Sequence, residues 1–332
     1  MALRVGINGF GRIGRNVLRA LLEQGRTDIE VVAINDLGPI ATNAHLLKYD
    51  SVHGRLNTDV QHNDEGILIN GQLIRVSAER DPAALAWQDV DIALECTGVF
   101  TSKAKAEAHL KNGSDKVLVS APSQGADKTI VYGVNHGTLS DADLIVSNAS
   151  CTTNCLAPVA KVLHDTFGIR RGLMTTVHSY TGDQPTLDTM HSDLYRGRAA
   201  AMNMIPTSTG AARAVGLVLP ELAGKLDGTA IRVPTPNVSC VDLTVELNKD
   251  TTEDEVNAAL TLAAQGQLNG VLGVTSEPLV SMDFNHNPLS SCIALDQTKL
   301  IEGNMLRVLS WYDNEWGFSN RMLDTAVAMS QA

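Results

Sequence analysis

LRVGINGFGRIG, residues 3–14, decides the fold class of the first half of the chain. An apolar strand is expected over Leu3–Asn8 and an amphipathic helix over Arg15–Leu22, with the GxGxxG pattern between them. The first glycine permits a tight turn, the second lets the backbone approach a pyrophosphate, and the third lets helix and strand pack closely. Amides at the helix start would then hold the phosphates. The residues predicted to bind a dinucleotide are Gly9, Gly11, Arg12, Ile13 and Gly14.

A second apolar strand, Ile29–Ile34, ends just before Asp36, which lies 22 residues beyond Gly14. A ribose-binding carboxylate belongs at this distance in a dinucleotide-binding unit. A carboxylate hydrogen-bonds a ribose 2′-hydroxyl but repels a 2′-phosphate, so NAD is expected rather than NADP. The alternative interpretation is a glycine turn followed by an Asp that caps a helix.

Strands alternate with helical stretches up to residue 150, which predicts a Rossmann-type, doubly wound parallel sheet. Ligands of such sheets lie at the carboxyl ends of the strands, so the Thr97-Gly98 and Ser120–Pro122 loops are expected to line the cofactor. The polar segment Glu79–Pro82 fits a surface turn and a cofactor contact equally well. The other expected elements are strands at Ile67–Ile69, Leu73–Val76, Asp91–Glu95, Lys116–Ser120 and Asp143–Ser147 and a helix over Ser102–Lys111.

Cys151 lies where a strand is expected to turn into a helix. The apolar run Leu144–Val146 precedes it, and Cys155 begins a helical pattern. Free N–H groups and the positive dipole end at a helix start favour a thiolate, so we expect a depressed pKa for Cys151 and a nucleophilic role beside a base. A buried, inert thiol is the alternative. Its polar neighbours suit phosphate or oxyanion contact; they are Ser150, Thr152, Thr153 and Asn154.

The second half offers a base and several anion-binding candidates. The β-branched run Leu173–Val177 leads into His178, a candidate base for the cysteine. A histidine that is merely satisfied by hydrogen bonds is the alternative. Residues 179–203 show little periodicity and are expected to form a functional or packed loop. The polar cluster Thr207–Gly210 precedes an expected helix and is an anion-site candidate. Arg232 lies in an apolar strand and needs an anionic ligand or a carboxylate.

The pattern after Cys151 predicts an α+β domain with a mostly antiparallel sheet and helices on one face. Thr252 is expected to cap a helix, and the domain boundary is expected near Ser150. The remaining expected elements are strands at Val238–Leu247, Val271–Val274, Cys292–Leu295 and Met305–Trp311 and helices at Ala211–Leu219, Thr252–Gln265 and Glu315–Met329.

The chain has 332 residues, enough for two domains, and 44% of them are hydrophobic. Its net charge of −11 disfavours nucleic acid as a partner. No apolar run reaches the ~18 residues of a membrane span, and the first residues are typical of a strand rather than a signal peptide, so a cytoplasmic protein without a membrane partner is expected. The five scattered cysteines indicate a reducing compartment. No metal is expected, because neither cysteines nor histidines show zinc-ligand spacing.

Taken together, the motifs closely resemble the phosphorylating glyceraldehyde-3-phosphate dehydrogenase family from end to end. The most specific are SNASCTTNCLAP at residues 147–158 and TTVH at residues 175–178, with INGFGRIGRNVLRA, INDL, LKYDSVHGR, RVPTPNVS and SWYDNEW in support. The resemblance implies oxidation of D-glyceraldehyde 3-phosphate to 1,3-bisphosphoglycerate, a glycolytic step, with NAD reduced and inorganic phosphate consumed. It also implies that a thiohemiacetal and then a thioester form on Cys151.

The resemblance assigns a role to each candidate residue. Cys151 would be the nucleophile and His178 the base. Inorganic phosphate would be held by Ser150, Thr152, Arg196, Thr209 and Gly210, and the phosphate of the substrate by Thr181 and Arg232. NAD would be contacted by Arg12, Ile13, Asp36, Arg80 and Ser120, and its nicotinamide amide by Asn314.

The family's architecture implies domain limits and an oligomer. The NAD-binding domain would comprise residues 1–150 and 315–332, because the family's last helix returns to it. The catalytic domain would comprise residues 151–314. The segment 179–203 resembles the loop that crosses to a neighbouring subunit, so a homotetramer is expected.

Two departures from the family pattern and three alternatives stay open. Thr189-Met190 stands where NAD-specific members commonly have Leu-Pro, which leaves some use of NADP open, and Phe318 replaces a usual Tyr with little expected effect. An erythrose-4-phosphate dehydrogenase shares the Cys–His pair but releases a free acid; the retained Arg196 and Thr209 favour the phosphorylating reaction. A non-catalytic binding protein on the same fold is the second alternative, and a gluconeogenic or carbon-fixing direction is the third.

Overall fold

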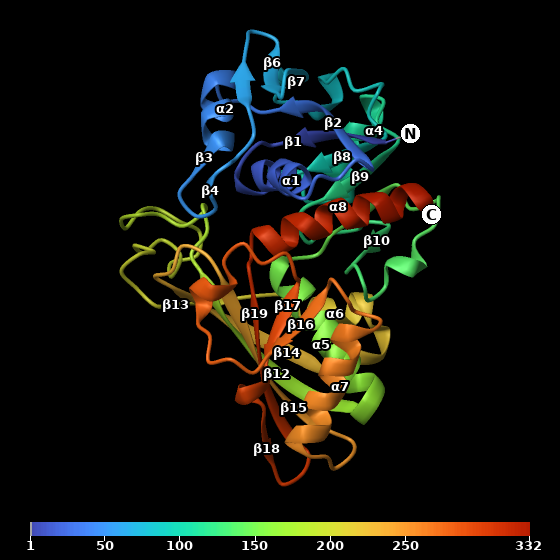
Figure 1. The fold of residues 1–332 in the computed structure, drawn as a ribbon, viewed down its shortest axis with the longest axis vertical. Coiled ribbons are helices and arrows are strands. Elements are labelled where there is room, and N and C mark those ends of the chain that lie inside the picture. The colour runs from blue at the N-terminus through green and yellow to red at the C-terminus, as the bar shows by residue number, and fades with distance from the viewer. Residues whose placement is uncertain (1) are drawn as a thin grey trace. The chain divides into compact units, whose positions relative to one another are not determined.

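The computed structural model describes residues 2–332, which divide into two compact units. One unit comprises the residues up to Ile130, His136–Ser150 and Ser319–Ala332. The other comprises Val131–Asn135 and Cys151–Phe318. Figure 1 labels most of the helices and strands of both units.

Within the described residues, the first unit is built on a nine-stranded sheet in the order β10-β11-β9-β8-β1-β2-β7-β6-β5. All neighbours from β10 to β7 are parallel, and β6 and β5 continue the sheet antiparallel. Val5, Ile7, Leu94 and Leu118 are fully buried, as expected for parallel strands covered on both faces. The predicted Rossmann-type sheet is thus confirmed. The strands are β1 (Leu3–Asn8), β2 (Ile29–Asn35), β5 (Val60–His62), β6 (Gly66–Ile69), β7 (Gln72–Ser77), β8 (Ile92–Glu95), β9 (Lys116–Val119), β10 (Lys128–Thr129) and β11 (Ile145–Ser147).

The helices of the first unit differ from the prediction at three places. The helix after the glycine loop begins at Arg12 rather than Arg15, so its first amides lie within the GxGxxG pattern. The helix expected over Ser102–Lys111 is split into α3 and α4, and α2 has no counterpart in the prediction. The elements are α1 (Arg12–Glu23), α2 (Ile40–Lys48), α3 (Lys103–Ala106), α4 (Ala108–Lys111), a small hairpin of β3 (Tyr49–Asp50) and β4 (Gly54–Arg55), 3₁₀ turns at Pro82–Ala84 and His136–Thr138, and the part of α8 (Trp316–Gln331) from Ser319 onward.

The second unit contains a mostly antiparallel sheet in the order β13-β14-β12-β15-β19-β17-β16, with β18 paired to β19. Only the β12–β14 and β16–β17 pairs are parallel among the described strands of this sheet. The predicted antiparallel character is confirmed. The strands are β12 (Ile169–Ser179), β13 (Ile205–Ser208), β14 (Leu226–Val233), β15 (Ser239–Leu247), β16 (Leu272–Thr275), β17 (Ser291–Ala294), β18 (Lys299–Ile301) and β19 (Met305–Tyr312).

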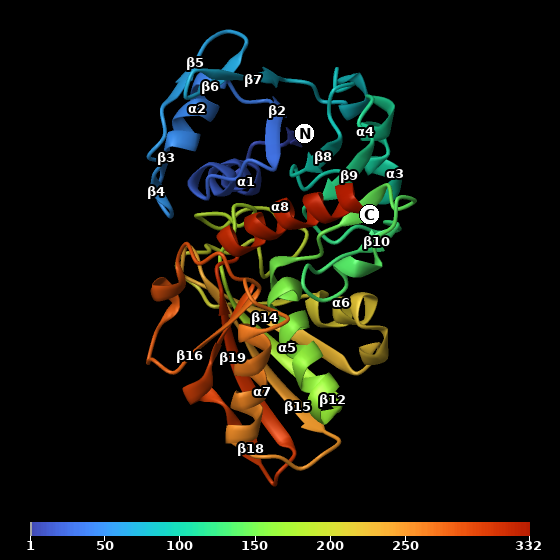
Figure 2. The same ribbon diagram turned by 45° about the vertical axis from the view of Figure 1, so that its right-hand side comes forward.

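Three helices cover one face of this sheet, as Figures 1 and 2 show: α5 (Cys151–Phe167), α6 (Ala211–Val218) and α7 (Glu253–Gln265). The predicted cap of α7 is confirmed. Thr252 accepts a hydrogen bond from the N–H of Glu255 at 3.2 Å, and the Glu255 carboxylate accepts one from the N–H of Thr252 at 3.0 Å. Short 3₁₀ turns lie at Pro220–Leu222, Ser281–Phe284 and Leu295–Gln297.

Alternation along β12 and β19 decides which side chains face the helices. In β12, Met174, Thr176 and His178 are buried, while the residues between them are more exposed. In β19, Ser310 and Tyr312 are buried in the same way. Since successive side chains of a strand point to opposite faces, these residues form the floor against which the helices pack. None of the helices formed by residues 2–332 has the length and apolar character of a membrane span.

Candidate active site and cofactor site

The helix α5 begins at Cys151 itself, four residues earlier than the sequence pattern indicated. The thiol therefore lies in the first helical turn, where backbone N–H groups are free and the dipole is positive. The Sγ atom of Cys151 is 3.6 Å from Nε2 of His178. The structure thus brings together the two residues predicted to be nucleophile and base.

The hydrogen bonds of His178 define which nitrogen faces the thiol. Its Nδ1 is 2.7 Å from the carbonyl oxygen of Ser179, which can only accept. Nδ1 therefore carries the proton, and Nε2 offers its lone pair to Cys151. The Nη1 of Arg232 lies 3.0 Å from the same Nδ1 and donates instead to the Ser179 carbonyl and to the hydroxyl of Thr181, each at 3.0 Å.

The electrostatics of the pair differ from the sequence expectation. Burial lowers the pKa of His178 to about 3, and the charge of Arg232 lowers it further, so the imidazole is neutral at pH 7. Burial also raises the pKa of the Cys151 thiol, against the opposing influence of Arg232 and Thr152. The depressed thiol pKa expected from the helix start alone is therefore wrong. The arrangement is a thiol beside a neutral base that can take its proton during attack.

Two arginines place positive charge beside this pair. Arg232 lies in β14 directly opposite His178 in β12, and its Nε is buried with no hydrogen-bond partner among the described residues. Arg196 donates from Nε to the hydroxyl of Thr207 at 3.0 Å. Burial lowers the pKa of Arg232, and the nearby charge of Arg196 lowers it further. An anion between these guanidiniums would relieve both effects.

The start of α6 lies near the start of α5. The hydroxyl of Thr153 donates to the carbonyl of Ala211 at 3.3 Å, and the N–H of Ala211 donates to the hydroxyl of Thr209 at 3.2 Å. Gly210 is the residue that caps α6. The predicted residues Thr209 and Gly210 thus come close to the helix that carries Cys151.

Thr152 and Ser150 are placed differently from the other phosphate candidates. The hydroxyl of Thr152 is buried and lies 2.8 Å from the hydroxyl of Tyr312, which is also 2.9 Å from that of Thr176. Tyr312 packs edge-on against His178, with ring centroids 6.0 Å apart. Ser150 directly precedes Cys151 and ends the first unit. The sequence analysis did not single out Tyr312. The feature that could have indicated it is an aromatic residue on the buried side of an alternating strand.

Asn314 follows β19 and is almost fully buried. Its carboxamide oxygen accepts hydrogen bonds from the hydroxyls of Ser179 and Ser239, both at 2.9 Å. Neither serine was singled out from the sequence, because their meeting depends on the pairing of distant strands. Ser179 adjoins the base, so Asn314 is linked to His178 through one residue.

A cavity of about 410 Å³ lies at the carboxyl ends of the first unit's strands. Four predicted cofactor residues line it: Gly9, Gly11, Asp36 and Arg80. Thr97, expected from its loop position, lines it as well. Arg12, Ile13, Gly14 and Ser120 do not line it, and Arg12 is ion-paired with Asp50 at 2.5 Å. The other lining residues are Asn8, Asn35, Leu37, Glu79, Cys96, Val99 and Phe100.

The glycines fit a dinucleotide in the way the motif requires. A Cβ on Gly9, whose φ is +89°, would lie 2.6 Å from the Thr97 nitrogen, and one on Gly14 would lie 2.2 Å from the Gly9 carbonyl oxygen. These two positions serve the turn and the packing of helix on strand. A Cβ on Gly11 would meet no atom within 4 Å and would project into open space. That space is where a pyrophosphate must approach the backbone.

Asp36 is held at the rim of this cavity. Its carboxylate accepts from the N–H of Phe10 at 2.8 Å and from the N–H of Gly38 at 2.8 Å. Phe10 belongs to the glycine loop, so the carboxylate also ties the end of β2 to that loop. The charge that would accept a ribose hydroxyl and repel a 2′-phosphate is thereby fixed in place.

A buried polar network forms the floor behind the cavity. The Glu95 carboxylate accepts from Nδ2 of Asn8 at 2.6 Å, from the N–H of Thr97 at 2.8 Å and from Nε2 of His109 at 2.9 Å. Asn8 in turn accepts from Asn35 at 2.8 Å. The network ties together the ends of β8, β1 and β2. No local sequence pattern predicts this network, because it depends on the order of the strands in the sheet.

Comparisons with known proteins match both parts of the chain. The family model described as glyceraldehyde 3-phosphate dehydrogenase, NAD binding domain, matches residues 3–103, and the C-terminal domain model of the same family matches residues 150–314. The chain is 70% identical over 331 residues to a glyceraldehyde-3-phosphate dehydrogenase of Cereibacter sphaeroides, covering 100% of this chain and 99% of the relative. It is 67% identical over 333 residues to one of Xanthobacter flavus and 58% identical over 334 residues to glyceraldehyde-3-phosphate dehydrogenase 1 of Bacillus subtilis, with the same coverage. The chain therefore belongs to the glyceraldehyde-3-phosphate dehydrogenase family.

Proposed function

We propose that Cys151 is the nucleophile and His178 the base of the reaction that this family catalyses. The chain is an NAD-dependent oxidoreductase that converts D-glyceraldehyde 3-phosphate and inorganic phosphate to 1,3-bisphosphoglycerate. The observation that carries the residue assignment is the 3.6 Å contact between Sγ of Cys151 and Nε2 of His178 at the start of α5.

Cys151 and His178 account for the proton movements at the sulfur and at the substrate carbonyl, and the proton of the attacking hydrogen phosphate leaves to solvent as the one proton that the overall reaction releases. The thiol of Cys151 adds to the aldehyde carbon while its proton passes through Nε2 of His178 to the carbonyl oxygen, which gives a thiohemiacetal. His178 then takes the hydroxyl proton as the carbonyl re-forms and the C–H bond breaks, which leaves a thioester on Cys151. Bound NAD supplies the acceptor for that hydride. Phosphate attacks the thioester carbon, and the departing thiolate recovers a proton from His178.

The surrounding groups would bind the two phosphates. The phosphate of the substrate would be held by Thr181 and Arg232, whose buried Nε has no partner among the described residues. Inorganic phosphate would be held by Ser150, Thr152, Arg196, Thr209 and Gly210, a set supported by the start of α6 and the charge of Arg196. Thr152 stays in this set although its hydroxyl is bonded to Tyr312.

NAD would be held by residues of both expected domains. The contacts would come from Gly9, Gly11, Arg12, Ile13, Gly14, Asp36, Arg80 and Ser120 in an NAD-binding domain of residues 1–150 and 315–332, and from Asn314 in a catalytic domain of residues 151–314. The open space at Gly11 and the carboxylate of Asp36 support this assignment. An erythrose-4-phosphate dehydrogenase and a non-catalytic binding protein are not favoured, since the relatives above are all named glyceraldehyde-3-phosphate dehydrogenase.

We also propose that the chain is a homotetramer, with segment 179–203 as one contact between subunits. This segment exposes large apolar side chains: Met190 is 97% and Leu194 is 86% exposed. Several large apolar side chains in one segment are seldom all exposed to solvent, and contact with a second copy of the chain would bury them.

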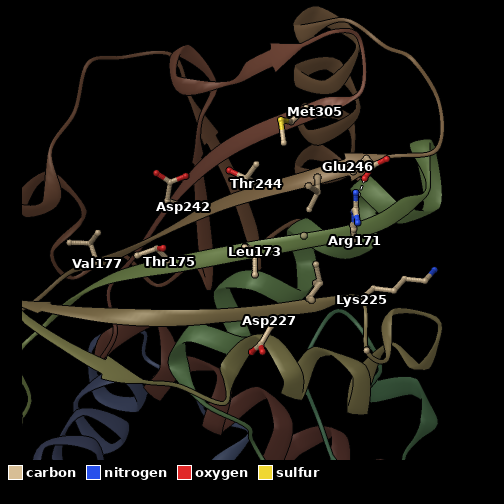
Figure 3. A pocket seen from close by; sticks show the side chains of 14 residues that line it. Arg171, Leu173, Thr175, Val177, Lys225, Asp227, Asp242, Thr244, Glu246 and Met305 are labelled. Carbon is tan, nitrogen blue, oxygen red and sulfur yellow. Dashed lines mark hydrogen bonds and ion pairs between the residues drawn. The ribbon is translucent and has the colours of Figure 1, made fainter.

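A second contact surface is needed, because a closed tetramer of two-fold symmetry uses at least two different interfaces. The face of the second sheet opposite the helices provides one. It holds a shallow pocket of about 870 Å³ that is lined along β12 by Leu173, Thr175 and Val177 (Figure 3). Leu173 is 67% exposed, and the ion pair of Arg171 with Glu246 lies at the edge.

Gly11→Ala is expected to leave the fold intact and to weaken NAD binding at least tenfold, because the new methyl group fits the chain but occupies the space of the pyrophosphate. Gly14→Ala should instead lower the thermal stability, since its Cβ would collide with the Gly9 carbonyl. Gly137→Ala is the matched control, with no neighbour within 4 Å. Calorimetric titration with NAD measures the affinity of each variant, and thermal melts measure its stability. Normal NAD affinity of Gly11→Ala would contradict the cofactor assignment.

Arg232→Gln removes a positive charge that favours the thiolate of Cys151. The pKa seen in the pH dependence of Cys151 alkylation by iodoacetamide should therefore rise by about one unit. The KM for the phosphorylated aldehyde should rise at least tenfold, with little change in the KM for NAD. Arg213→Gln, which breaks only an exposed pair with Asp227, is the control. An unchanged alkylation profile together with equal effects on both KM values would remove Arg232 from the substrate site.

Sedimentation velocity at micromolar concentration is expected to show a tetramer. Leu173→Asp puts a charge on the proposed sheet interface and should produce a smaller species. Leu262→Asp in α7 is the control, because Leu262 is comparably exposed on the helix side and should leave the tetramer intact. A monomeric parent protein would rule out the oligomer, and a tetrameric Leu173→Asp variant would rule out this interface.

A further inference from the structure

The turn between β19 and α8 is fixed by a buried carboxylate. Asp313 accepts hydrogen bonds from the N–H groups of Glu315 and Trp316 at 2.9 and 2.7 Å, which caps the start of α8. Its other oxygen accepts from Nδ2 of Asn237 at 2.8 Å and from the N–H of His286 at 2.7 Å. Four donors thus hold the backbone on either side of Asn314, and the position of its Cα is set by the fold.

The side chain of Asn314 is fixed separately by two serines. Both hydroxyls donate to its carboxamide oxygen, and Ser239 also accepts from the N–H of Ser179 at 3.0 Å. Ser179 and Ser239 are both buried. Among the described residues, the Asn314 oxygen is the acceptor for the proton of each of these hydroxyl groups. If the carboxamide were turned over, its NH₂ would face both hydroxyls and leave their protons without that acceptor, which is unfavourable for buried polar groups.

We propose that Ser179 and Ser239 are positioning residues that set the orientation of the Asn314 carboxamide and so present its NH₂ group to the nicotinamide. This inference rests on the proposed contact between Asn314 and the cofactor. With the oxygen occupied by two serine donors, the side chain can act toward a ligand only as a donor. The carboxamide oxygen of nicotinamide is the acceptor that matches it.

Because Ser179 contacts His178 and Asn314 through different groups, its effect on Asn314 can be tested without changing the Cys151–His178 pair. Its backbone carbonyl holds Nδ1 of His178 and Nη1 of Arg232, whereas its hydroxyl holds Asn314. Replacing Ser179 by Ala removes only the hydroxyl that holds Asn314. Ser239→Ala removes the second donor to Asn314 and also the acceptor of the Ser179 N–H, so Ser179→Ala is the cleaner of the two variants. The reactivity of Cys151 should therefore be preserved while recognition of the nicotinamide is lost.

The test compares the affinity for NAD with that for ADP-ribose, the same molecule without nicotinamide. Calorimetric titration should show that Ser179→Ala and Ser239→Ala each weaken NAD binding at least fivefold and leave ADP-ribose binding unchanged. The pH dependence of Cys151 alkylation should also stay unchanged. Ser310→Ala is the matched control, because it removes a buried hydroxyl of the same sheet that is bonded to Ser291 at 2.5 Å. If the serines had only a structural role, their replacement would instead weaken the binding of both NAD and ADP-ribose, and this result would overturn the proposal.

Two variants of Asn314 separate this inference from the proposed function. Asn314→Asp keeps acceptors for both serines but has no NH₂ group, so it should lose the preference for NAD over ADP-ribose. If Asn314→Ala leaves that preference intact, Asn314 does not contact the nicotinamide and the proposed cofactor assignment fails. If Asn314→Ala abolishes the preference but both serine variants retain it, the positioning role is overturned while the assignment stands.

Discussion

The start of α5 against the buried face of β12 is the constraint on which the catalytic site depends. Because the helix begins at Cys151 and every second residue of β12 faces it, the thiol and the imidazole of His178 come within 3.6 Å. The same row of the sheet brings Arg232 beside His178 in the neighbouring strand. The proposed nucleophile, base and anion-binding charge are therefore placed by one register of strand pairing, and a slip of one residue would turn His178 to the other face.

Burial governs how this site works. It keeps His178 neutral, with a pKa near 3, and it keeps Cys151 protonated until a carbonyl group arrives. The base is then ready across the physiological pH range, and charge develops only as the reaction proceeds. Preorganised donors around a dry site stabilise such developing charge more than water does. In the mechanism proposed here, Arg232 and Arg196 would supply that stabilisation.

The local patterns of the sequence predicted both sheets, the glycine loop, Asp36 and the cap at Thr252, because each depends on residues close together in the chain or on strand periodicity. They marked Cys151 and His178 only as candidates, and the family resemblance predicted them as a pair. The sequence pattern places the start of α5 four residues late, since Cys, Thr and Asn are poor helix formers and tertiary packing outweighs that preference. The sequence alone could not predict the roles of Tyr312, of the serines around Asn314 or of the Glu95 network. They are defined by which distant strands become neighbours, and a single sequence does not carry that information.

The most direct test of a thioester on Cys151 is NADH formation in rapid mixing of enzyme, NAD and glyceraldehyde 3-phosphate without inorganic phosphate. The account predicts a burst of one NADH per Cys151 thiol that then stops, because the thioester has no acceptor. Addition of phosphate should restart continuous turnover. Steady NADH formation without phosphate, at the rate seen with it, would contradict a phosphate-dependent thioester and the anion site built around Arg196 and Thr209.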